Sequence, residues 1–359
     1  MTASVTPCLV SLATASPRHD LEQGLVAVRA GEIFAPHHGS LERLAPIFHN
    51  AAIENRQVSA PLDWFFAPHS FTERNDLFLT TAVDLLAQAA TDALARAGIS
   101  ADAIDTLVTI SSTGIATPAL DARLMEVVPF RRNVQRLPVF GLGCAGGVLG
   151  LARAAAMAKA EPGSNVLLLV VELCSLTFRF ADRSKSNLIA TALFGDGAAA
   201  AVIRCEAGPE GHPVLGPSGE HTWPGSLGVM GWDVADDGLR VVFSRDIPAL
   251  VRDDLAPVVE AFLGDHDLTF GDIDTFLCHP GGAKVLDALE SVFGLAPGAL
   301  IDSREVLRAH GNMSAVTVLF VLERALARGA EGRFLLTTLG PGFTAALLLI
   351  EVPPRVVRS

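Results

Sequence analysis

A cysteine at the junction of a strand and a helix constrains the fold of this chain more than any other feature. Residues 136–172 read RLPVFGLGCAGGVLGLARAAAMAKAEPGSNVLLLVVE, and the short apolar run Leu137–Phe140 predicts a strand. The chain then turns through two glycines, presents Cys144, and continues as an Ala-rich helix that a Pro-Gly pair ends. A buried strand, Val166–Val171, follows. This order of elements predicts an α/β fold with Cys144 at the start of a helix.

The position of Cys144 also predicts its reactivity. The partial positive charge at a helix N-terminus favours a thiolate, which can lower a thiol pKa from about 8.5 to roughly 3.5–7.5. The small residues Ala145, Gly146 and Gly147 would let an acyl group approach the sulfur. Ordinary packing of a buried cysteine among small residues is at least as common as a reactive thiol. The choice therefore depends on residues elsewhere in the chain.

Composition narrows the class of protein. With 359 residues, half of them apolar, the chain can form one large α/β unit or two packed halves. A net charge of −12 argues against a nucleic-acid binder, which would need a basic face. We expect no membrane span and no signal peptide. Five scattered cysteines without CxxC spacing predict a reducing, cytoplasmic location and no metal site.

The second part of the chain repeats the order of elements of the first. A helix, a Gly-containing stop, a strand, a Gly-x-Gly turn and a further strand are expected twice, at 145–203 and at 312–350. Such a duplication predicts two similar α/β halves with a site at their junction. The Gly/Pro-rich segment Glu206–Gly238 is the expected boundary. We therefore divide the chain into 1–205, with Cys144, and 206–359.

Two further residues stand where strands meet helices in the second half. His279 follows the apolar run Ile273–Cys278 and precedes a Gly-rich turn, the usual place for a site residue in an α/β sheet. Asn312 lies immediately before the apolar helix Met313–Leu326. Each has an ordinary alternative: a satisfied core histidine for one and a helix N-cap for the other.

Together the three side chains suit acyl-thioester chemistry. A thiolate can carry an acyl group, and an imidazole and a carboxamide can donate hydrogen bonds to a carbonyl oxygen that becomes anionic. Each such donor lowers a barrier by on the order of 3 kcal/mol. No Asp or Glu adjoins His279 in sequence. These groups favour carbanion chemistry over hydrolysis.

At these residues the chain resembles a known family. GLGCAGG, ALFGDGAAA, CHPGGAKVLDALE, HGNMSAV and GPGFTA are similar, in order, to the signature segments of type III polyketide synthases, the chalcone-synthase-like branch of the thiolase superfamily. The related ketosynthase III enzymes also use Cys, His and Asn, but typically carry His-Gln-Ala-Asn where this chain has His-Pro-Gly-Gly at 279–282. The resemblance is closer to bacterial members than to plant ones.

The resemblance implies a homodimer with the thiolase fold, a duplicated five-layer αβαβα arrangement. It implies that Cys144 is loaded from an acyl-CoA, while His279 and Asn312 hold malonyl-CoA and stabilise the enolate left by decarboxylation. CoA thioesters are then substrates, and no resident cofactor is expected. Basic residues that bind CoA phosphates in the family are poorly matched here, and Arg43, Arg56 and Lys284, with Gly281, are the candidates to replace them.

The resemblance also implies pocket residues. Phe194 matches the phenylalanine that gates the CoA tunnel, and Val241 falls at a second gate position, where it would widen the cavity. Thr113, Thr177 and Ser314 fall at positions that line the pocket and steer cyclisation. Thr117 falls where a loop crosses into the partner subunit. For Phe194 and Val241 ordinary core packing is the alternative.

The function expected is an iterative acyltransferase that extends an acyl-CoA starter with malonyl-CoA and cyclises the product. Val241 and the small or apolar pocket residues favour a fatty acyl starter and an alkylpyrone or alkylresorcinol product. A malonyl or aromatic starter, giving a phloroglucinol- or chalcone-type product, is compatible with the same residues. Three further hypotheses stay open: a single ketosynthase III-like condensation on acyl carrier protein, a catalytically silent thiolase-fold partner and a Cys-His hydrolase.

Overall fold

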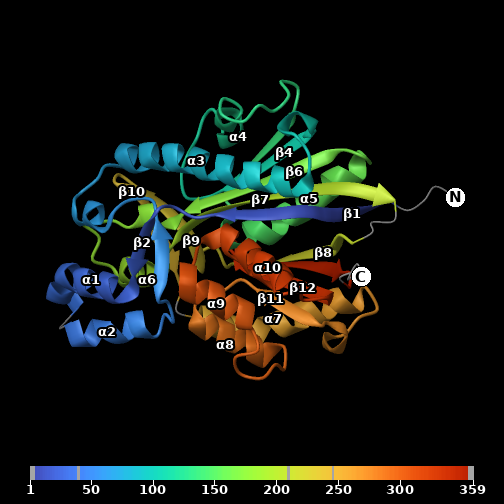
Figure 1. Ribbon diagram of the computed structural model, residues 1–359. Helices are drawn as coiled ribbons and strands as arrows, with labels where there is room; N and C mark the ends of the chain where they lie inside the picture. The colour runs from blue at the N-terminus through green and yellow to red at the C-terminus, as the bar shows by residue number, and fades with distance from the viewer. Residues whose placement is uncertain (1–4, 39–40, 208–210, 245, 355–359) are drawn as a thin grey trace.

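A mixed sheet forms the framework of the protein. The computed structural model describes residues 5–38, 41–207, 211–244 and 246–354, without the side chains of 41–43. The strands are β1 (Val5–Ala15), β2 (His19–Glu22), β3 (Asn55–Val58), β4 (Thr106–Ser111), β5 (Gln135–Phe140), β6 (Asn165–Leu173), β7 (Asp196–Ala207), β8 (Val214–Thr222), β9 (Met230–Ala235), β10 (Gly238–Phe243), β11 (Thr275–Cys278), β12 (Gly332–Gly340) and β13 (Thr344–Val352). Nine of them follow the order β11–β12–β13–β8–β1–β7–β6–β4–β5, while β9 pairs with β10 and β2 with β3 (Figure 1).

The large sheet consists of two parts with the same pattern of strand directions. In one part β1 and β7 are antiparallel, β7 and β6 antiparallel, and β6 and β4 parallel. In the other part β8, β13, β12 and β11 repeat these three relations in the same order. One residue pair, Cys8 with Val214, joins β1 to β8 where the two parts meet. The repeat predicted from the sequence is therefore present as a repeat of sheet topology.

Helices cover both parts and fill the space between them. They are α1 (Gln23–His38), α2 (Leu41–His49), α3 (Phe71–Ala97), α4 (Leu120–Leu124), α5 (Gly146–Ala160), α6 (Lys185–Leu193), α7 (Ile247–Gly264), α8 (Ala283–Val292), α9 (Ile301–His310) and α10 (Thr317–Ala327). Short 3-10 turns are η1 (Leu62–Phe66), η2 (Ala101–Ala103), η3 (Gly143–Ala145), η4 (Cys174–Thr177), η5 (Phe270–Asp272) and η6 (Ser314–Val316). The predicted helices and strands around the cysteine and the histidine are confirmed. The helix expected from Met313 begins at Thr317, after the turn η6.

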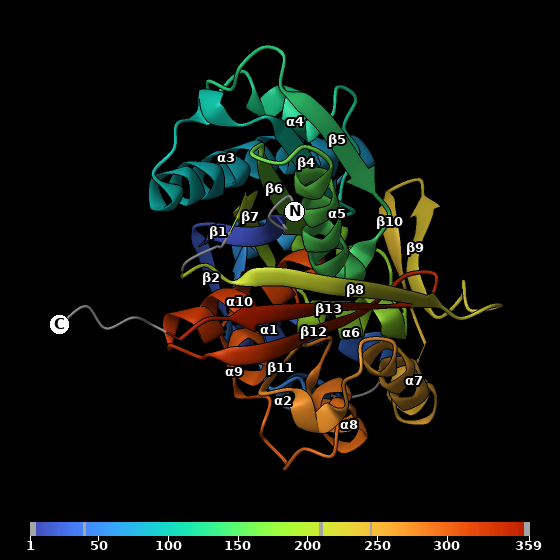
Figure 2. The ribbon, with the colours of Figure 1, turned by 90° about the vertical axis from the view of Figure 1, so that its right-hand side faces the viewer.

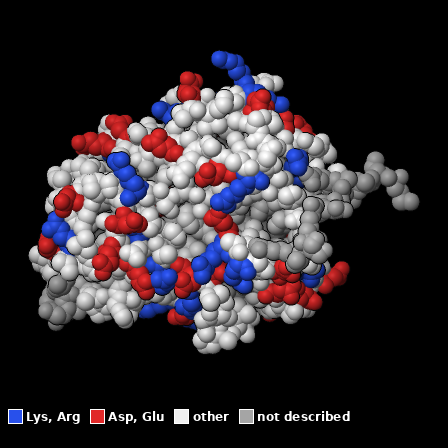
Figure 3. Space-filling model, viewed as in Figure 1, with Lys and Arg blue, Asp and Glu red and all other residues white. Residues whose placement is uncertain are grey.

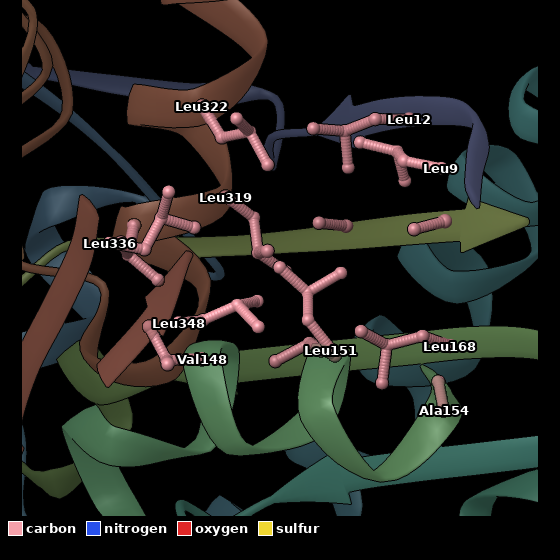
Figure 4. Close-up of a cluster of buried hydrophobic side chains, with 14 of the residues drawn as sticks. Leu9, Leu12, Val148, Leu151, Ala154, Leu168, Leu319, Leu322, Leu336 and Leu348 are labelled. Carbon is pink, nitrogen blue, oxygen red and sulfur yellow. The ribbon is translucent and has the colours of Figure 1, made fainter. Parts of the chain in front are cut away.

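The elements stack in five layers. In Figure 2 helix α5 lies above β8, β13 and β12, and helices α7 and α8 lie below these strands. Helix α3 packs on the first part of the sheet, α5 and α10 lie between the two parts, and α7 and α8 pack on the outer face of the second part. Apolar side chains from both parts and from the central helices meet in one buried cluster (Figure 4), which includes Leu9, Leu12, Val148, Leu151, Ala154, Leu168, Leu319, Leu322, Leu336 and Leu348. Burial of this central layer holds the two parts together.

Helix α3 is the one described helix with the length and apolar content of a membrane span. It begins with a capping box formed by Ser70 and Glu73 and ends at Gly98, which has a left-handed conformation. Its apolar residues, among them Leu86, Ala89 and Ala93, are buried against β1, β6 and β7. Burial in the protein accounts for the apolar character of the helix.

Charged side chains of both signs are mixed over the face seen in Figure 3, without an extended basic area on that face. Arg96 pairs with Glu323 at 2.6 Å, and Arg328 pairs with Asp302 at 2.9 Å. That face carries no basic stripe of the kind that nucleic-acid-binding proteins present.

Candidate active site

A cavity of about 480 Å³ brings the three predicted catalytic residues together. Cys144, His279 and Asn312 all line it. The volume falls within the range of small-molecule sites, about 300–1,000 Å³. The first part of the sheet and its helices supply the cysteine, and the second part supplies the other two residues. The site therefore lies at the junction of the repeats, as the sequence predicted.

Cys144 lies in the turn η3, which passes directly into helix α5. The glycines that follow it serve a purpose different from the one predicted. A Cβ at Gly147 would lie 2.3 Å from the backbone oxygen of Ala315 and 2.5 Å from Val318. These small residues therefore let the start of α5 pack against η6 and α10. The prediction that they make room for an acyl group is wrong for Gly147.

His279 stands immediately after β11, and its backbone N–H donates to the carbonyl of Thr337 at 2.9 Å. Its side chain is buried, and neither ring nitrogen has a hydrogen-bond partner among the described residues. A buried polar group without a partner is rare, and a catalytic role is one of the reasons for which a protein keeps one. The imidazole is therefore able to bind a group that enters the cavity.

Asn312 is held by its backbone and by half of its side chain. Its N–H donates to the carbonyl of Leu193 at 2.8 Å, and its carbonyl accepts from Gly195 at 3.0 Å. The side-chain oxygen accepts from the N–H of Ser314, while Nδ2 donates to the Gly281 carbonyl at 3.3 Å. An amide NH₂ has two donors, so one remains for a ligand. Asn312 does not cap α10, because η6 precedes that helix.

Burial decides the protonation of both titratable groups. It raises the pKa of the Cys144 thiol to about 12, against a smaller lowering by a hydrogen bond with the Ser314 side chain. It lowers the pKa of His279 to about 3. The predicted lowering of the thiol pKa is therefore wrong for this structure, because desolvation outweighs the helix dipole. At neutral pH the resting pair is a thiol and a neutral imidazole.

Glu172, near the end of β6, is a buried carboxyl at the site that was not predicted. It accepts hydrogen bonds from Ser112 N at 3.0 Å, Ser112 Oγ at 2.7 Å and Thr113 Oγ1 at 2.8 Å. Burial raises its pKa to about 7, although these bonds lower it. Its negative charge would in turn raise the pKa of Cys144. A glutamate that ends an apolar strand was the available signal in the sequence.

Phe194 and Val241 pack against each other, together with Cys174 and Ala190. The Phe194 ring lies 5.8 Å from the ring of Phe243, which lines the large cavity. Phe194 also borders a separate apolar cavity of about 60 Å³. It therefore borders the small cavity and contacts a residue in the wall of the large one. Val241 is a core contact of Phe194 and does not line either cavity among the described residues.

Thr113, Thr177 and Ser314 were expected to line the pocket, and among the described residues none of them lines the large cavity. Thr113 and Thr177 border a separate pocket of about 10 Å³, and the hydroxyl of Thr177 donates to the Cys174 carbonyl at 2.7 Å. Ser314 is buried beside the thiol. The side chains of both threonines are occupied by the protein itself. Thr117 is exposed.

The candidates for binding CoA phosphates lie in different places. Lys284 is exposed, lines the large cavity and is the second residue of α8, and Gly281 lines the cavity too. Arg56 is only 2 % exposed and lies in β3. It donates to backbone carbonyls of residues 191, 192 and 194, so it is not placed to bind a phosphate. The side chain of Arg43 lies outside the described residues.

Comparisons with known proteins give the family of this chain. The family model "Chalcone and stilbene synthases, N-terminal domain" matches residues 64–208, and the corresponding C-terminal model matches 217–353. A putative chalcone synthase from Bacillus subtilis (strain 168) is 39% identical over 96% of this chain and 98% of its own length. A 1,3,6,8-tetrahydroxynaphthalene synthase from Streptomyces peucetius subsp. caesius is 38% identical over 94% and 91%.

A solved structure extends the agreement to the fold. The 1,3,6,8-tetrahydroxynaphthalene synthase of Streptomyces coelicolor A3(2), described as a bacterial type III polyketide synthase, is 28% identical, with a TM-score of 0.91. The similarity covers 98% of this chain and all of that one. The paired family models, the relatives and the convergence of Cys144, His279 and Asn312 in one cavity show that this chain belongs to the chalcone and stilbene synthases, the type III polyketide synthases, and is an acyltransferase with the thiolase-like fold.

Proposed function

We propose that Cys144 accepts an acyl group from an acyl-CoA and that His279 and Asn312 drive the decarboxylation of malonyl-CoA for repeated condensation. One observation carries this assignment. Both ring nitrogens of His279 are buried without a partner among the described residues, in the cavity that also holds the thiol and the free donor of Asn312. A substrate carbonyl oxygen between these two side chains would satisfy both.

Loading exchanges one thioester for another. The sulfur of Cys144 attacks the acyl-CoA carbonyl while its proton passes to His279, and the departing CoA sulfur then takes that proton. Because burial raises the pKa of the thiol and lowers that of the imidazole, a stable ion pair is not favoured before substrate enters. Proton transfer and attack are therefore coupled.

Extension begins when malonyl-CoA replaces the departed CoA. The carboxylate leaves as CO₂, and its bonding electrons form an enolate whose oxygen accepts hydrogen bonds from His279 and Asn312. With a pKa of about 3 the imidazole is neutral at pH 7, and one ring nitrogen carries a hydrogen that it can donate. The enolate carbon attacks the thioester, and Cys144 is released to accept the lengthened chain.

We assign the CoA end of the substrate to the mouth of the cavity near Lys284. This exposed cation stands in the first turn of α8, where backbone N–H groups also point outward. CoA thioesters are the substrates, and no resident cofactor is part of this proposal. Lys284→Ala should raise the KM for malonyl-CoA severalfold with kcat unchanged. The control is the same substitution of Lys159, a cation at the far end of α5, which should leave KM unchanged.

For the starter we propose a fatty acyl group. Apolar residues from several elements, including Ile47, Ile189, Leu193, Ile247 and Leu289, line the cavity, and an alkyl tail would cover this surface. The test is mass spectrometry of products formed from malonyl-CoA and starters from acetyl-CoA to stearoyl-CoA. Alkylpyrones or alkylresorcinols that disappear in Cys144→Ala support the proposal. The absence of condensed products with every starter contradicts it.

The second candidate uses malonyl-CoA as its own starter. The observation that favours it is the 38% identity to a 1,3,6,8-tetrahydroxynaphthalene synthase, whose named product is a compact aromatic without an alkyl tail. The same mass spectrometry of products distinguishes a malonyl starter from a fatty acyl starter. Product from malonyl-CoA alone, with long-chain starters inactive, would select this candidate over the fatty acyl starter.

We also propose a homodimer that forms along β5. This strand ends the order of the large sheet, and Leu137 and Phe140 are exposed on it, with Ile115 and Val127 exposed on the chain before it. An open strand edge with apolar side chains is normally covered, and a second copy of β5 would do so. Light scattering should find a dimer for the native chain and a monomer for Phe140→Glu. A monomeric native chain contradicts this assignment.

We place the protein in the cytoplasm. All five cysteines are buried thiols outside any disulfide, which suits a reducing compartment, and acyl-CoA and malonyl-CoA are substrates of that compartment. Fractionation of the producing cells should recover the protein with cytoplasmic markers, and recovery with the membrane fraction would contradict the assignment.

A further inference from the structure

The buried arginine of strand β3 lies one short segment away from a proposed catalytic residue. Arg56 Nη1 donates to the carbonyls of Thr191 at 2.7 Å and Phe194 at 3.0 Å, and Nη2 donates to that of Ala192 at 3.0 Å. These carbonyls stand at the C-terminal end of helix α6, where backbone acceptors lack partners within the helix. One guanidinium therefore collects three of them.

The same segment holds Asn312 from its other side. Leu193 accepts the Asn312 N–H and Gly195 donates to the Asn312 carbonyl, and Phe194 and Asn312 form a parallel bridge. Space is tight, because a Cβ at Gly195 would lie 2.1 Å from the carbonyl oxygen of His310. Residues 193–195 are thus fixed between the guanidinium and the backbone of the asparagine.

A buried carboxylate completes the arrangement around Arg56. Asp196 accepts from Ser59 and Ser175, each through its N–H and its hydroxyl, at distances between 2.5 and 2.8 Å. Its charge acts on Arg56, which burial would otherwise make harder to keep charged. Strand β3, turn η4 and the start of β7 are therefore linked around the segment that carries Phe194.

We infer that Arg56 is a positioning residue for Asn312, acting through the backbone of residues 193–195. The guanidinium holds the Phe194 carbonyl and the Thr191 and Ala192 carbonyls just before it. The segment in turn fixes the backbone of Asn312, and that backbone sets where the carboxamide donor meets the substrate oxygen. This inference rests on the proposed function of Asn312 in decarboxylation. It predicts that loss of the Arg56 guanidinium slows the decarboxylation of malonyl-CoA, which needs the Asn312 donor, and leaves the acylation of Cys144 nearly unchanged.

The variant for the test is Arg56→Lys, which keeps the charge but cannot reach three carbonyls with one rigid fork. Acylation of Cys144 by acyl-CoA, followed by intact mass, should stay within about threefold of the native rate. Release of CO₂ from malonyl-CoA should fall between about ten- and a hundredfold, the usual effect of a small displacement of a catalytic group. If both rates fall by the same factor, Arg56 only supports the fold and the inference is wrong.

The control is Arg74→Lys. Arg74 is also buried, and it donates to backbone carbonyls of Leu176 and Phe178, which make no hydrogen bond with Asn312. Arg74→Lys should lower the melting temperature about as much as Arg56→Lys does, without a selective loss of CO₂ release. A selective loss in Arg74→Lys as well would contradict a specific link from Arg56 to Asn312.

A second measurement does not depend on activity. Hydrogen exchange followed by mass spectrometry should show faster exchange of the Gly195 and Asn312 amides in Arg56→Lys, by about tenfold, and unchanged exchange there in Arg74→Lys. Unchanged exchange in Arg56→Lys overturns the inference. If the native chain releases no CO₂, the proposed function fails, while the exchange result still decides the link.

If Arg56→Lys does not fold, Gln23→Leu is a gentler variant, because it removes a second donor to one of the three carbonyls that Arg56 holds. Gln23 Nε2 donates to the Ala192 carbonyl at 3.0 Å. Gln23→Leu should change CO₂ release and amide exchange in the same direction by a smaller factor. No change in either quantity would contradict the inference.

Discussion

The two halves of the fold use equivalent positions in opposite ways. Strand β4 runs parallel to β6 and β11 runs parallel to β12, and each register, continued past its last paired residues, places Ser112 opposite Glu172 and His279 opposite Thr338. In the first half the polar pair is closed, with two hydrogen bonds between Ser112 and Glu172. In the second half both side chains are buried and unpartnered among the described residues.

The difference between these two pairs shows which half of the fold has polar groups available to bind a substrate. Buried polar groups without partners cost about 1–3 kcal/mol each, and the side chains of Thr337, Thr338 and His279 all belong to this class among the described residues. All three line the large cavity. The second half therefore places its unpartnered donors and acceptors on the large cavity, where a substrate can satisfy them. Unpartnered groups of the first half, such as the hydroxyls of Thr109 and Ser111, do not line that cavity among the described residues.

The largest expected effect tests whether catalysis resides in the open half. Asn312→Ala removes one donor to the enolate oxygen, so CO₂ release from malonyl-CoA should fall about 10²–10³-fold, with Cys144 still acylated by acyl-CoA. Its counterpart in the closed half is Ser112→Ala, which should change CO₂ release less than threefold. Equal losses of CO₂ release in Asn312→Ala and Ser112→Ala would show that decarboxylation does not depend on the second half alone.

The contact between the halves is tested by Gly147→Ala. Its new Cβ would meet the backbone oxygen of Ala315 at 2.3 Å, so α5 must move away from η6, and overpacking of this kind costs about 1–3 kcal/mol. The melting temperature and the condensation rate should both fall. Gly24→Ala in α1 is the matched control, because its Cβ would meet nothing closer than 3.6 Å. Full activity of Gly147→Ala would argue against tight contact between the helix starts.

The closed half has its own pH dependence. Burial raises the pKa of Glu172 to about 7, from its usual value of 4.5. The folded protein therefore keeps this proton while the unfolded chain loses it, and stability that is fully present below pH 4.5 is lost as the pH rises through 7. This loss in the free energy of unfolding is on the order of 3 kcal/mol at about pH 8. It should be absent in Glu172→Gln, whose side chain does not titrate. Urea unfolding of both proteins at about pH 5 and pH 8 measures it; parallel changes would contradict the raised pKa.

The smallest effect concerns Thr338, at the position equivalent to Glu172. Its hydroxyl is buried without a partner among the described residues, so Thr338→Val should leave stability unchanged or raise it by about 1 kcal/mol. Thermal unfolding measures this. A clear loss of stability would mean that the hydroxyl is already satisfied and that the second half is less open than its unpartnered groups indicate.

The parts of the site that the sequence predicted have strong local signals. Cys144, His279 and Asn312 each stand between an apolar run and a Gly-rich or helical segment, and the repeat of elements indicated that they would meet. The predictions that were wrong concern properties that depend on burial. Arg56 lies in a short polar stretch that looks exposed, and the pKa of Cys144 follows desolvation that no local pattern reveals.

The pocket residues show a second limit. Thr113 and Thr177 were expected at the cavity, but their hydroxyls bond within the protein, to Glu172 and to the carbonyl of Cys174. Whether a side chain reaches a cavity depends on small shifts of the backbone in turns such as η4. Periodicity and residue type do not carry that information.

The most direct test of the division between the halves measures acylation and decarboxylation in the same two variants. Cys144→Ala should lose the acyl-enzyme mass with every acyl-CoA and still release CO₂ from malonyl-CoA. His279→Gln should release CO₂ at least about 10²-fold more slowly than the native enzyme. This pattern is the predicted result. Loss of CO₂ release in folded Cys144→Ala, or native CO₂ release in His279→Gln, would contradict the division of labour between the two halves.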